Sequence, residues 1–289
     1  MSNLPPAWTN DRCRRPGALA LCQRPATGER VTMDLTGQTV LVTGADGGIG
    51  RALVEELAKR DVHLLAGMRD TGSFIAISER GAREVRPVRM ELSSRAQIDT
   101  CLAELAAERI DVLINNAGQF DGGLLEAQDL DRVYAMIQVN LTGLIHLTQA
   151  VAGPMLARGH GKIVNNASIA GYVPFPGAAI YSATKAGVVG FTQALRRELR
   201  ETGVTVLEVV TPGVETDMLA EVREDYEPHT EDPSKIEGIE PDEWARKIVA
   251  AIEGDDDLLN PTGAERLAKL ASRGPGRVLD GVLGRVFER

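Results

Sequence analysis

The chain has 289 residues, a formal net charge of −9 and a sequence pI near 5.1. This length suits one large α/β domain, and the acidic balance excludes a general nucleic-acid surface, which requires a basic patch. The three cysteines form neither a disulfide framework nor a metal-ligand cluster, so we expect a cytoplasmic protein without a metal site.

The N-terminal residues 1–32 stand apart from the rest of the sequence. They are arginine-rich, and their only apolar piece, residues 18–22, is shorter than the ~7 residues of a signal-peptide core. No apolar run in the chain reaches the ~18 residues that a membrane-spanning helix needs. We expect residues 1–32 to be a disordered extension, or to lie upstream of a true start at Met33.

From residue 37 onwards, apolar strand-like runs alternate with amphipathic helical runs. The strand candidates are 39–43, 62–66, 85–90, 112–115, 162–166 and 204–210, and the helical stretches are 50–60, 95–109, 130–158, 181–202 and 241–253. Alternation at this pitch predicts βαβ units and an α/β fold with a doubly wound parallel sheet, a Rossmann fold, in which both faces of the sheet are covered. We therefore expect one catalytic domain over 33–253, followed by an amphipathic helical extension over 254–289.

The first strand leads into a glycine-rich turn and then a helix, the order that a dinucleotide-binding turn requires. Residues 43–50 read Thr-Gly-Ala-Asp-Gly-Gly-Ile-Gly. Gly44 can adopt the tight turn, Gly48 allows backbone to approach a pyrophosphate, and Gly50 permits close helix–strand packing. The unpaired N–H groups of the helix N-terminus would face the phosphates.

A second pattern joins Ser168, Tyr181 and Lys185. Tyr181 and Lys185 are four residues apart, so in a helix they lie on one face. The ammonium there favours the ionised form of a phenol that ordinarily titrates near pH ~10. A phenol tuned in this way can exchange a proton with an alcohol or carbonyl near neutral pH. Together with the glycine turn, this pattern predicts a hydride-transfer enzyme.

These residues resemble the short-chain dehydrogenase/reductase family over about residues 35 to 253. The resemblance rests on five motifs in the family's order: T-G-x-x-x-G-x-G at Thr43, Gly44, Gly48 and Gly50; N-N-A-G at Asn115, Asn116, Ala117 and Gly118; Asn140 in V-N-L-T-G; the Ser168, Tyr181 and Lys185 spacing; and Pro212-Gly213 followed by Val214 and Thr216. It also implies a homodimer or homotetramer formed through the helices at 130–158 and 181–202.

The same resemblance implies a catalytic tetrad of Asn140, Ser168, Tyr181 and Lys185. Tyr181 would be the general acid in reduction and the base in oxidation. Lys185 would hold the nicotinamide ribose and, with the charge of the oxidised nicotinamide, lower the Tyr181 pKa. Ser168 would hydrogen-bond the substrate oxygen, and Asn140 would fix a water that links Lys185 to solvent.

The cofactor implied is NADP, with NAD as the alternative. Met68 stands where NAD-binding relatives carry an acid, and Arg69 can contact the additional phosphate of NADP. Two residues favour NAD instead. Asp70 would take the acidic position if the alignment shifted, and Asp46 stands in the glycine turn where many NADP-preferring relatives carry a basic residue. Glu91 and Leu92 occupy the adenine-pocket positions, although a plain surface role for Glu91 is an equal alternative. The expected cofactor contacts are Gly44, Asp46, Gly48, Ile49, Gly50, Arg69, Glu91, Leu92, Asn116, Ala117, Gly118, Tyr181, Lys185, Pro212, Gly213, Val214 and Thr216.

The substrate is predicted only as a class, a hydrophobic alcohol or ketone. A charged loop over 216–240 would cover the site. An apolar pocket would be lined by Met218, Leu219, Val222 and Tyr226 of this loop and by residues 172–176 opposite. The alternative is that these side chains only pack the covering loop.

Two alternatives stay open at this stage. The sequence at 254–289 predicts two short amphipathic helices, divided by Gly274-Pro275-Gly276, that dock on a membrane surface or partner, or else fold back on the domain.

For the whole chain, the favoured function is an NADP-dependent oxidoreductase acting on a secondary alcohol or carbonyl. The other candidate is a catalytically silent cofactor-binding sensor or scaffold; a sugar-nucleotide epimerase is disfavoured by the chain length.

Overall fold

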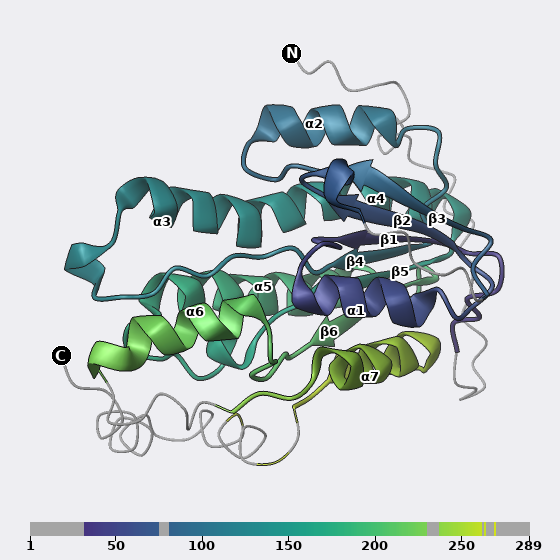
Figure 1. The fold of residues 1–289 in the computed structure, drawn as a ribbon. Coiled ribbons are helices and arrows are strands. Elements are labelled where there is room, and N and C mark those ends of the chain that lie inside the picture. The colour runs from purple at the N-terminus through teal and green to yellow at the C-terminus, as the bar shows by residue number, and fades with distance from the viewer. Residues whose placement is uncertain (1–31, 75–80, 230–236, 262, 264–268, 270–289) are drawn as a thin grey trace.

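The computed structural model describes residues 32–74, 81–229, 237–261, 263 and 269 (Figure 1). Its centre is a seven-stranded sheet in the order β3-β2-β1-β4-β5-β6-β7, with every pairing parallel. The strands are β1 (Thr39–Thr43), β2 (His63–Met68), β3 (Glu84–Arg89), β4 (Val112–Asn115), β5 (Gly161–Asn166), β6 (Val204–Val209) and β7 (Leu258–Leu259). The predicted doubly wound parallel sheet is confirmed.

The central strands are buried on both faces, as the apolar runs predict. In β4 and β5 every residue is buried, including the polar Asn115 and Lys162. The edge strand β3 differs from the expected apolar pattern, because most of its side chains are only partly covered. Pro87 lies within this strand, a position that an edge tolerates because no ladder on its outer side is broken. The short β7 was not predicted, since its two residues are too few to form a pattern.

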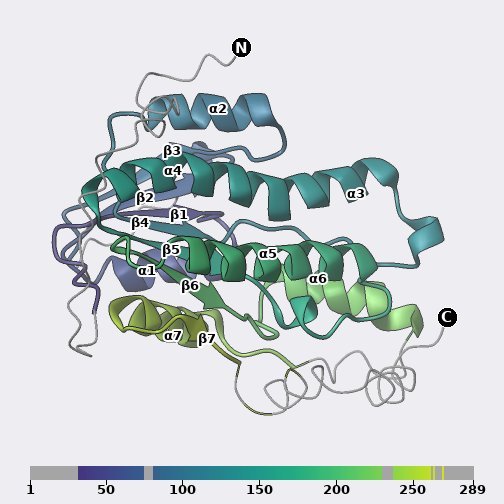
Figure 2. The same ribbon diagram turned by 180° about the vertical axis from the view of Figure 1, so that it is seen from behind.

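Helices cover both faces of the sheet. On one face α1 (Gly48–Leu57) and α7 (Pro241–Glu253) lie side by side (Figure 1). On the other face lie α2 (Arg95–Glu104), α3 (Leu130–Ile137), α4 (Leu144–Arg158) and α5 (Ala179–Glu198) (Figure 2). Each face has its own apolar cluster, one containing Leu53 and Trp244 and the other containing Leu102 and Leu147. This arrangement buries apolar side chains of the helices against both faces of the sheet.

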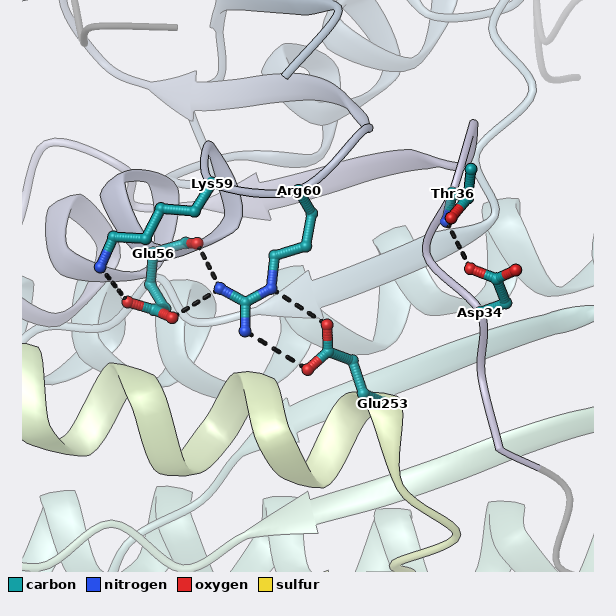
Figure 3. A network of polar contacts seen from close by, with 6 residues as sticks. All are labelled: Asp34, Thr36, Glu56, Lys59, Arg60 and Glu253. Atoms are coloured by element: carbon teal, nitrogen blue, oxygen red, sulfur yellow. Dashed lines mark hydrogen bonds and ion pairs between the residues drawn. The ribbon is translucent and has the colours of Figure 1, made fainter. Parts of the chain in front are cut away.

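Polar contacts fasten α1 to α7 at the end of the sheet that lies away from the glycine turn. Arg60 donates to the Glu253 carboxylate at 3.0 and 3.3 Å and to the main-chain oxygen of Glu56 at 2.7 Å (Figure 3). Lys162, buried in β5, donates to the carbonyls of Ile252 and Gly254 at 2.6 and 2.9 Å. Lys162 thereby satisfies carbonyl groups that the end of α7 leaves without helical partners.

The helix predicted over 130–158 is interrupted. A π-helical turn, η5 (Gln138–Gly143), separates α3 from α4 and contains Asn140. Such turns widen a helix by one residue and are frequent at functional sites. The interruption redirects the Asn140 side chain towards the loop that follows β4, where it bonds to Gln119.

The segment expected to be a loop over 216–240 begins as a helix. Thr216 caps α6 (Asp217–Tyr226) by accepting a hydrogen bond from the Leu219 amide. The sequence of α6 did not show a helical period of apolar residues, because many of its side chains are charged and only Leu219 is buried. A short 3₁₀ turn, η7 (Glu227–His229), follows α6.

The predictions made for residues 1–31 and for the two C-terminal amphipathic helices fall outside the described residues, apart from Lys269. Within the described part of the chain, no helix combines the length and the apolar character needed to cross a membrane.

Candidate active site

A cavity of about 1070 Å³ opens at the carboxyl ends of the strands. Every residue expected to contact the cofactor lines it, from Gly44 in the first turn to Thr216 before α6. Of the four expected catalytic residues, Ser168, Tyr181 and Lys185 line the cavity, and Asn140 is buried behind it. Segments from the loops after β1, β2, β3, β4, β5 and β6 therefore converge where parallel α/β sheets bind ligands.

The glycine turn after β1 is shaped to receive a phosphate group. Gly44 has a φ of 65°, which favours glycine, and a Cβ on Gly50 would lie 1.9 Å from the Gly44 carbonyl oxygen. Helix α1 then begins without a capping side chain and without an acidic residue in its first turn. Its N-terminal N–H groups and positive dipole end consequently face the cavity, an arrangement that fits the pyrophosphate of a dinucleotide.

Gly48 meets a requirement that sequence reasoning did not include. A Cβ at this position would lie 2.4 Å from the Thr216 Cγ2 atom. The small residue is therefore required by the approach of the loop before α6, in addition to any need for space beside a phosphate.

The Asn-Asn-Ala-Gly segment after β4 is locked to this turn. The Thr43 hydroxyl accepts hydrogen bonds from the amides of Asn116 and Ala117 at 3.0 and 2.9 Å. In return, the Asn116 side-chain amide donates to the carbonyl of Thr43 at 3.0 Å. These bonds join the loops on either side of the crevice between β1 and β4.

The expected catalytic residues meet at the ends of β5 and α5. Ser168 begins the 3₁₀ turn η6 (Ile169–Gly171), and its hydroxyl is hydrogen-bonded to Tyr181. Tyr181 and Lys185 lie one turn apart on α5, with the Lys185 Nζ 5.7 Å from the Tyr181 ring centroid. Phe120 packs edge-on against Tyr181 with the ring centroids 5.2 Å apart, a contact that the sequence did not reveal.

Burial sets the ionisation of the two α5 groups. It raises the pKa of Tyr181, and the hydrogen bond with Ser168 opposes this effect. Burial also lowers the pKa of Lys185 to about 8, because the ammonium loses its hydration. The direction for Tyr181 is opposite to the expected lowering: in the protein by itself, desolvation of the phenolate outweighs the hydrogen bond with Ser168.

Asn140 contributes through the loop after β4. Its Oδ1 accepts from the Gln119 amide and its Nδ2 donates to the Gln119 carbonyl, both at 2.8 Å. Nδ2 also donates to the Thr184 hydroxyl on α5 at 3.3 Å. The side chain thus ties the cavity loop to the helix that carries Tyr181 and Lys185.

Asn166 is a site residue that sequence reasoning missed. Its carbonyl accepts from the Lys185 Nζ at 2.9 Å, and its Nδ2 donates to the Asn116 Oδ1 at 3.0 Å. The Thr211 hydroxyl donates to its Oδ1. A polar residue at the carboxyl end of a buried strand was the available signal, and Asn166 links three of the loops around the cavity.

The far end of the cavity carries the residues expected at the adenosine half. The residue at the end of β2 is the buried Met68, so no carboxylate stands there. Arg69, which follows it, is exposed on the cavity rim. Asp70 accepts from the Gly72 amide at 2.9 Å, which occupies it in the adjoining turn. Glu91 likewise accepts from the Ser93 amide at 3.0 Å while lining the cavity with Leu92. Among the described residues, none forms an ion pair with Arg69.

The other half of the cavity is largely apolar. Met218, Leu219, Val222 and Tyr226 line it as expected, but from the opposite wall over 172–176 only Phe175 does so. Tyr172 points to the far side instead, where it packs against Leu144 and Val188, because the η6 turn rotates the chain between Ser168 and Tyr172. The expected contribution of Tyr172 to the pocket is therefore wrong.

Comparison with known proteins identifies the fold's relatives. The family model for short chain dehydrogenases matches residues 38–227. The 3-oxoacyl-(acyl-carrier-protein) reductase FabG of Escherichia coli is 35% identical over 196 residues, covering 67% of this chain and 80% of that protein. A putative ketoacyl reductase of Streptomyces coelicolor is 40% identical over 205 residues, covering 65% of this chain and 75% of that one.

Solved structures agree with this assignment. A short-chain dehydrogenase from Burkholderia cenocepacia in complex with NADP has a TM-score of 0.73 and 28% identity, covering 87% of this chain and 99% of that one. One from Sphingobium yanoikuyae in complex with NADPH has a TM-score of 0.70 and 28% identity, covering 86% and 96% of the two chains. With its matching motifs gathered around one cavity, the chain belongs to the short-chain dehydrogenase/reductase family of oxidoreductases, which act on CH–OH and carbonyl groups.

Proposed function

We propose that the protein is an NADP-dependent oxidoreductase that interconverts a secondary alcohol and an uncharged, apolar ketone. The observation that carries the proposal is the single cavity that holds Ser168, Tyr181 and Lys185 at one end and Arg69 at the other. NADP and NADPH in the two solved relatives support the choice of cofactor. Bound there, the cofactor supplies or accepts the hydride.

The roles follow from position and chemistry. Ser168 and Tyr181 share a hydrogen bond and both line the cavity, so both can bind one substrate oxygen. Tyr181 holds the proton that the oxygen receives in reduction. Lys185, fixed by the Asn166 carbonyl, keeps a positive charge beside the phenol and offers N–H donors to ribose hydroxyls. Asn140 positions the Gln119 segment against α5, and we retain its expected part in a water path to Lys185 as a proposal.

The charges around the substrate half favour an uncharged substrate. Four carboxylates lie near this half: Glu221, Glu224 and Asp225 on α6, and Asp121 on the loop facing it. The nearby cations are already engaged with carboxylates, Arg132 with Asp121 at 2.9 Å and Arg223 with Glu215 at 2.7 Å. An anionic substrate would therefore meet like charge at the described entrance, while the apolar lining would accept a hydrophobic ketone. We place this activity in the cytoplasm, on the basis of the cysteine content.

Replacing the central phenol tests the mechanism. Tyr181→Phe should lower the rate of ketone reduction by about 10²–10⁴-fold, because the general acid is lost. NADPH oxidation across a panel of apolar ketones measures the rate, and NADPH binding by fluorescence checks that the site is intact. The control is Arg246→Ala, which alters an exposed residue on α7. Equal rates for wild type and Tyr181→Phe would favour the silent sensor or scaffold.

The pH dependence of reduction should report Lys185. Tyr181 stays protonated through neutral and mildly basic pH, because its pKa is raised above its ordinary value near ~10. Lys185 loses its proton near its pKa of about 8, so kcat/KM for reduction should fall above that pH. In Lys185→Met the residual activity should lack this decline. A decline that persists in the variant would assign it to another group.

Cofactor choice should depend on Arg69. Losing a charge-assisted contact costs about 1.5–3 kcal/mol, so Arg69→Ala should raise the KM for NADPH by roughly 10- to 100-fold. The KM for NADH should change by less than about threefold, since NADH lacks the phosphate that Arg69 would contact. Arg246→Ala, on the exposed side of α7, is the matched control. An equal loss for both cofactors would remove Arg69 as the selective residue.

We further propose that the protein self-associates through α3. Leu130, Tyr134 and Ile137 are 70%, 72% and 38% exposed, and their spacing places them on one face of the helix. An apolar strip of this kind, repeated on a second copy about a two-fold axis, forms a self-complementary interface. α3 is the first part of the 130–158 segment, one of the two helices through which the family resemblance implies pairing.

Two acidic substitutions test the interface. The double variant Leu130→Glu/Tyr134→Glu should halve or quarter the mass measured by light scattering, because four carboxylates would face one another across the two-fold axis. Arg246→Glu on α7 controls for added negative charge. An unchanged mass in the double variant would exclude α3 as the interface.

A further inference from the structure

A buried polar cluster lies outside the cavity, behind the turn that carries Ser168. Its central member is Tyr172, the residue that directly follows η6. The Tyr172 hydroxyl donates to the Glu208 carboxylate and accepts a hydrogen bond from the Gln193 Nε2 at 3.3 Å. Tyr172 thereby connects the Ser168 turn to β6 and to α5.

The acid that Tyr172 contacts is almost completely enclosed. Glu208 is 1% exposed, and Arg196 on α5 lies 3.8 Å from its other oxygen. A buried carboxylate is costly unless it is paired and hydrogen-bonded. The Tyr172 hydroxyl is consequently held firmly, because releasing it would remove a hydrogen bond from a buried charge.

A lysine from beyond the catalytic domain covers the Tyr172 ring. Lys269 is only 4% exposed, and its Nζ lies 3.9 Å from the ring centroid of Tyr172. The same Nζ donates to the Asn260 Oδ1 at 2.7 Å. Lysine is rarely buried to this extent without partners, and a desolvated ammonium over an aromatic face is among the stronger cation–π contacts.

Other contacts also hold the Ser168 turn. The Ile169 amide donates to the Thr211 carbonyl at 2.9 Å, and Gly171 packs so closely on α5 that a Cβ there would lie 2.8 Å from the Lys185 backbone. Tyr172 adds a link from the end of the turn to β6, and Lys269 covers the ring that makes this link.

We propose that Lys269 is a positioning residue for the active site: by clamping the Tyr172 ring, it fixes the turn that presents the Ser168 hydroxyl. Lys269 then belongs to the support of the catalytic residues, which favours the fold-back alternative over docking on a membrane. The kinetic part of this inference rests on the proposed function, whereas the structural part does not.

Three variants separate positioning from general stability. Lys269→Met keeps the length and apolar stem but removes the charge, Lys269→Arg restores a cation, and Tyr172→Leu removes the ring. With a ketone that the wild type reduces, Lys269→Met and Tyr172→Leu should each lower kcat by roughly 5- to 30-fold, matching a cation–π contact of about 1–2 kcal/mol. The NADPH Kd should stay within about twofold, and Lys269→Arg should recover most of the rate.

Combining the two substitutions tests whether they act as one unit. The double variant Lys269→Met/Tyr172→Leu should lose no more than the worse single variant, because both disrupt the same contact. A wild-type kcat in Lys269→Met, failure of Lys269→Arg to recover the rate, or losses that multiply in the double variant would each overturn the proposal.

A measurement without turnover keeps this test separate from the proposed activity. Hydrogen exchange at the amides of 169–173 should quicken in Lys269→Met relative to the wild type, while exchange in α1 stays unchanged. If no ketone is reduced but this local change appears, the clamp stands and the proposed substrate fails. Unchanged exchange at 169–173 would overturn the clamp whatever the activity.

Discussion

The crevice between β1 and β4 is the constraint on which the site depends. The chain builds β1, β2 and β3 outwards in one direction, then returns across the sheet to place β4 on the other side of β1. The loops after β1 and β4 must therefore diverge to opposite faces, which leaves an opening at their carboxyl ends. Hydrogen bonds from Thr43 and Asn116 close the base of this opening. Ser168, Tyr181 and Lys185 are carried to its edge by the next strand and helix.

Desolvation gives the gathered residues their chemical character. Burial moves the pKa of Tyr181 up and that of Lys185 down to about 8, so the proton affinities of the two groups, which are close for the free side chains, move apart. Buried amides from Asn140 and Asn166 hold the surrounding loops with hydrogen bonds to backbone and side chains. Polar groups enclosed in this way must all be satisfied, and satisfying them makes the site rigid.

Sequence reasoning succeeded where local patterns carry their own physical cause. The strands β1 and β4 were predicted at their observed bounds, because short Val- and Leu-rich runs between turns can only be buried strands in this context. It failed where tertiary contacts overrule the local pattern. The π-helical turn at Asn140 exists because that side chain is bonded to Gln119, and α6 forms although its charged face conceals the helical period. Tyr172 was expected in the substrate pocket, but the η6 turn directs it to Glu208.

The sequence by itself determined the fold class, the glycine turn and the identity of the groups that can transfer a proton, because spacing along a strand or helix sets which side chains share a face. Only the tertiary structure decided how those groups are tuned and supported. Tyr181 is desolvated by the packing around it. Lys185 donates a hydrogen bond to the Asn166 carbonyl, and Lys269 lies over the Tyr172 ring, so both contacts join residues that lie far apart in the chain. Such contacts follow from the packing of the whole domain, and no local pattern encodes them.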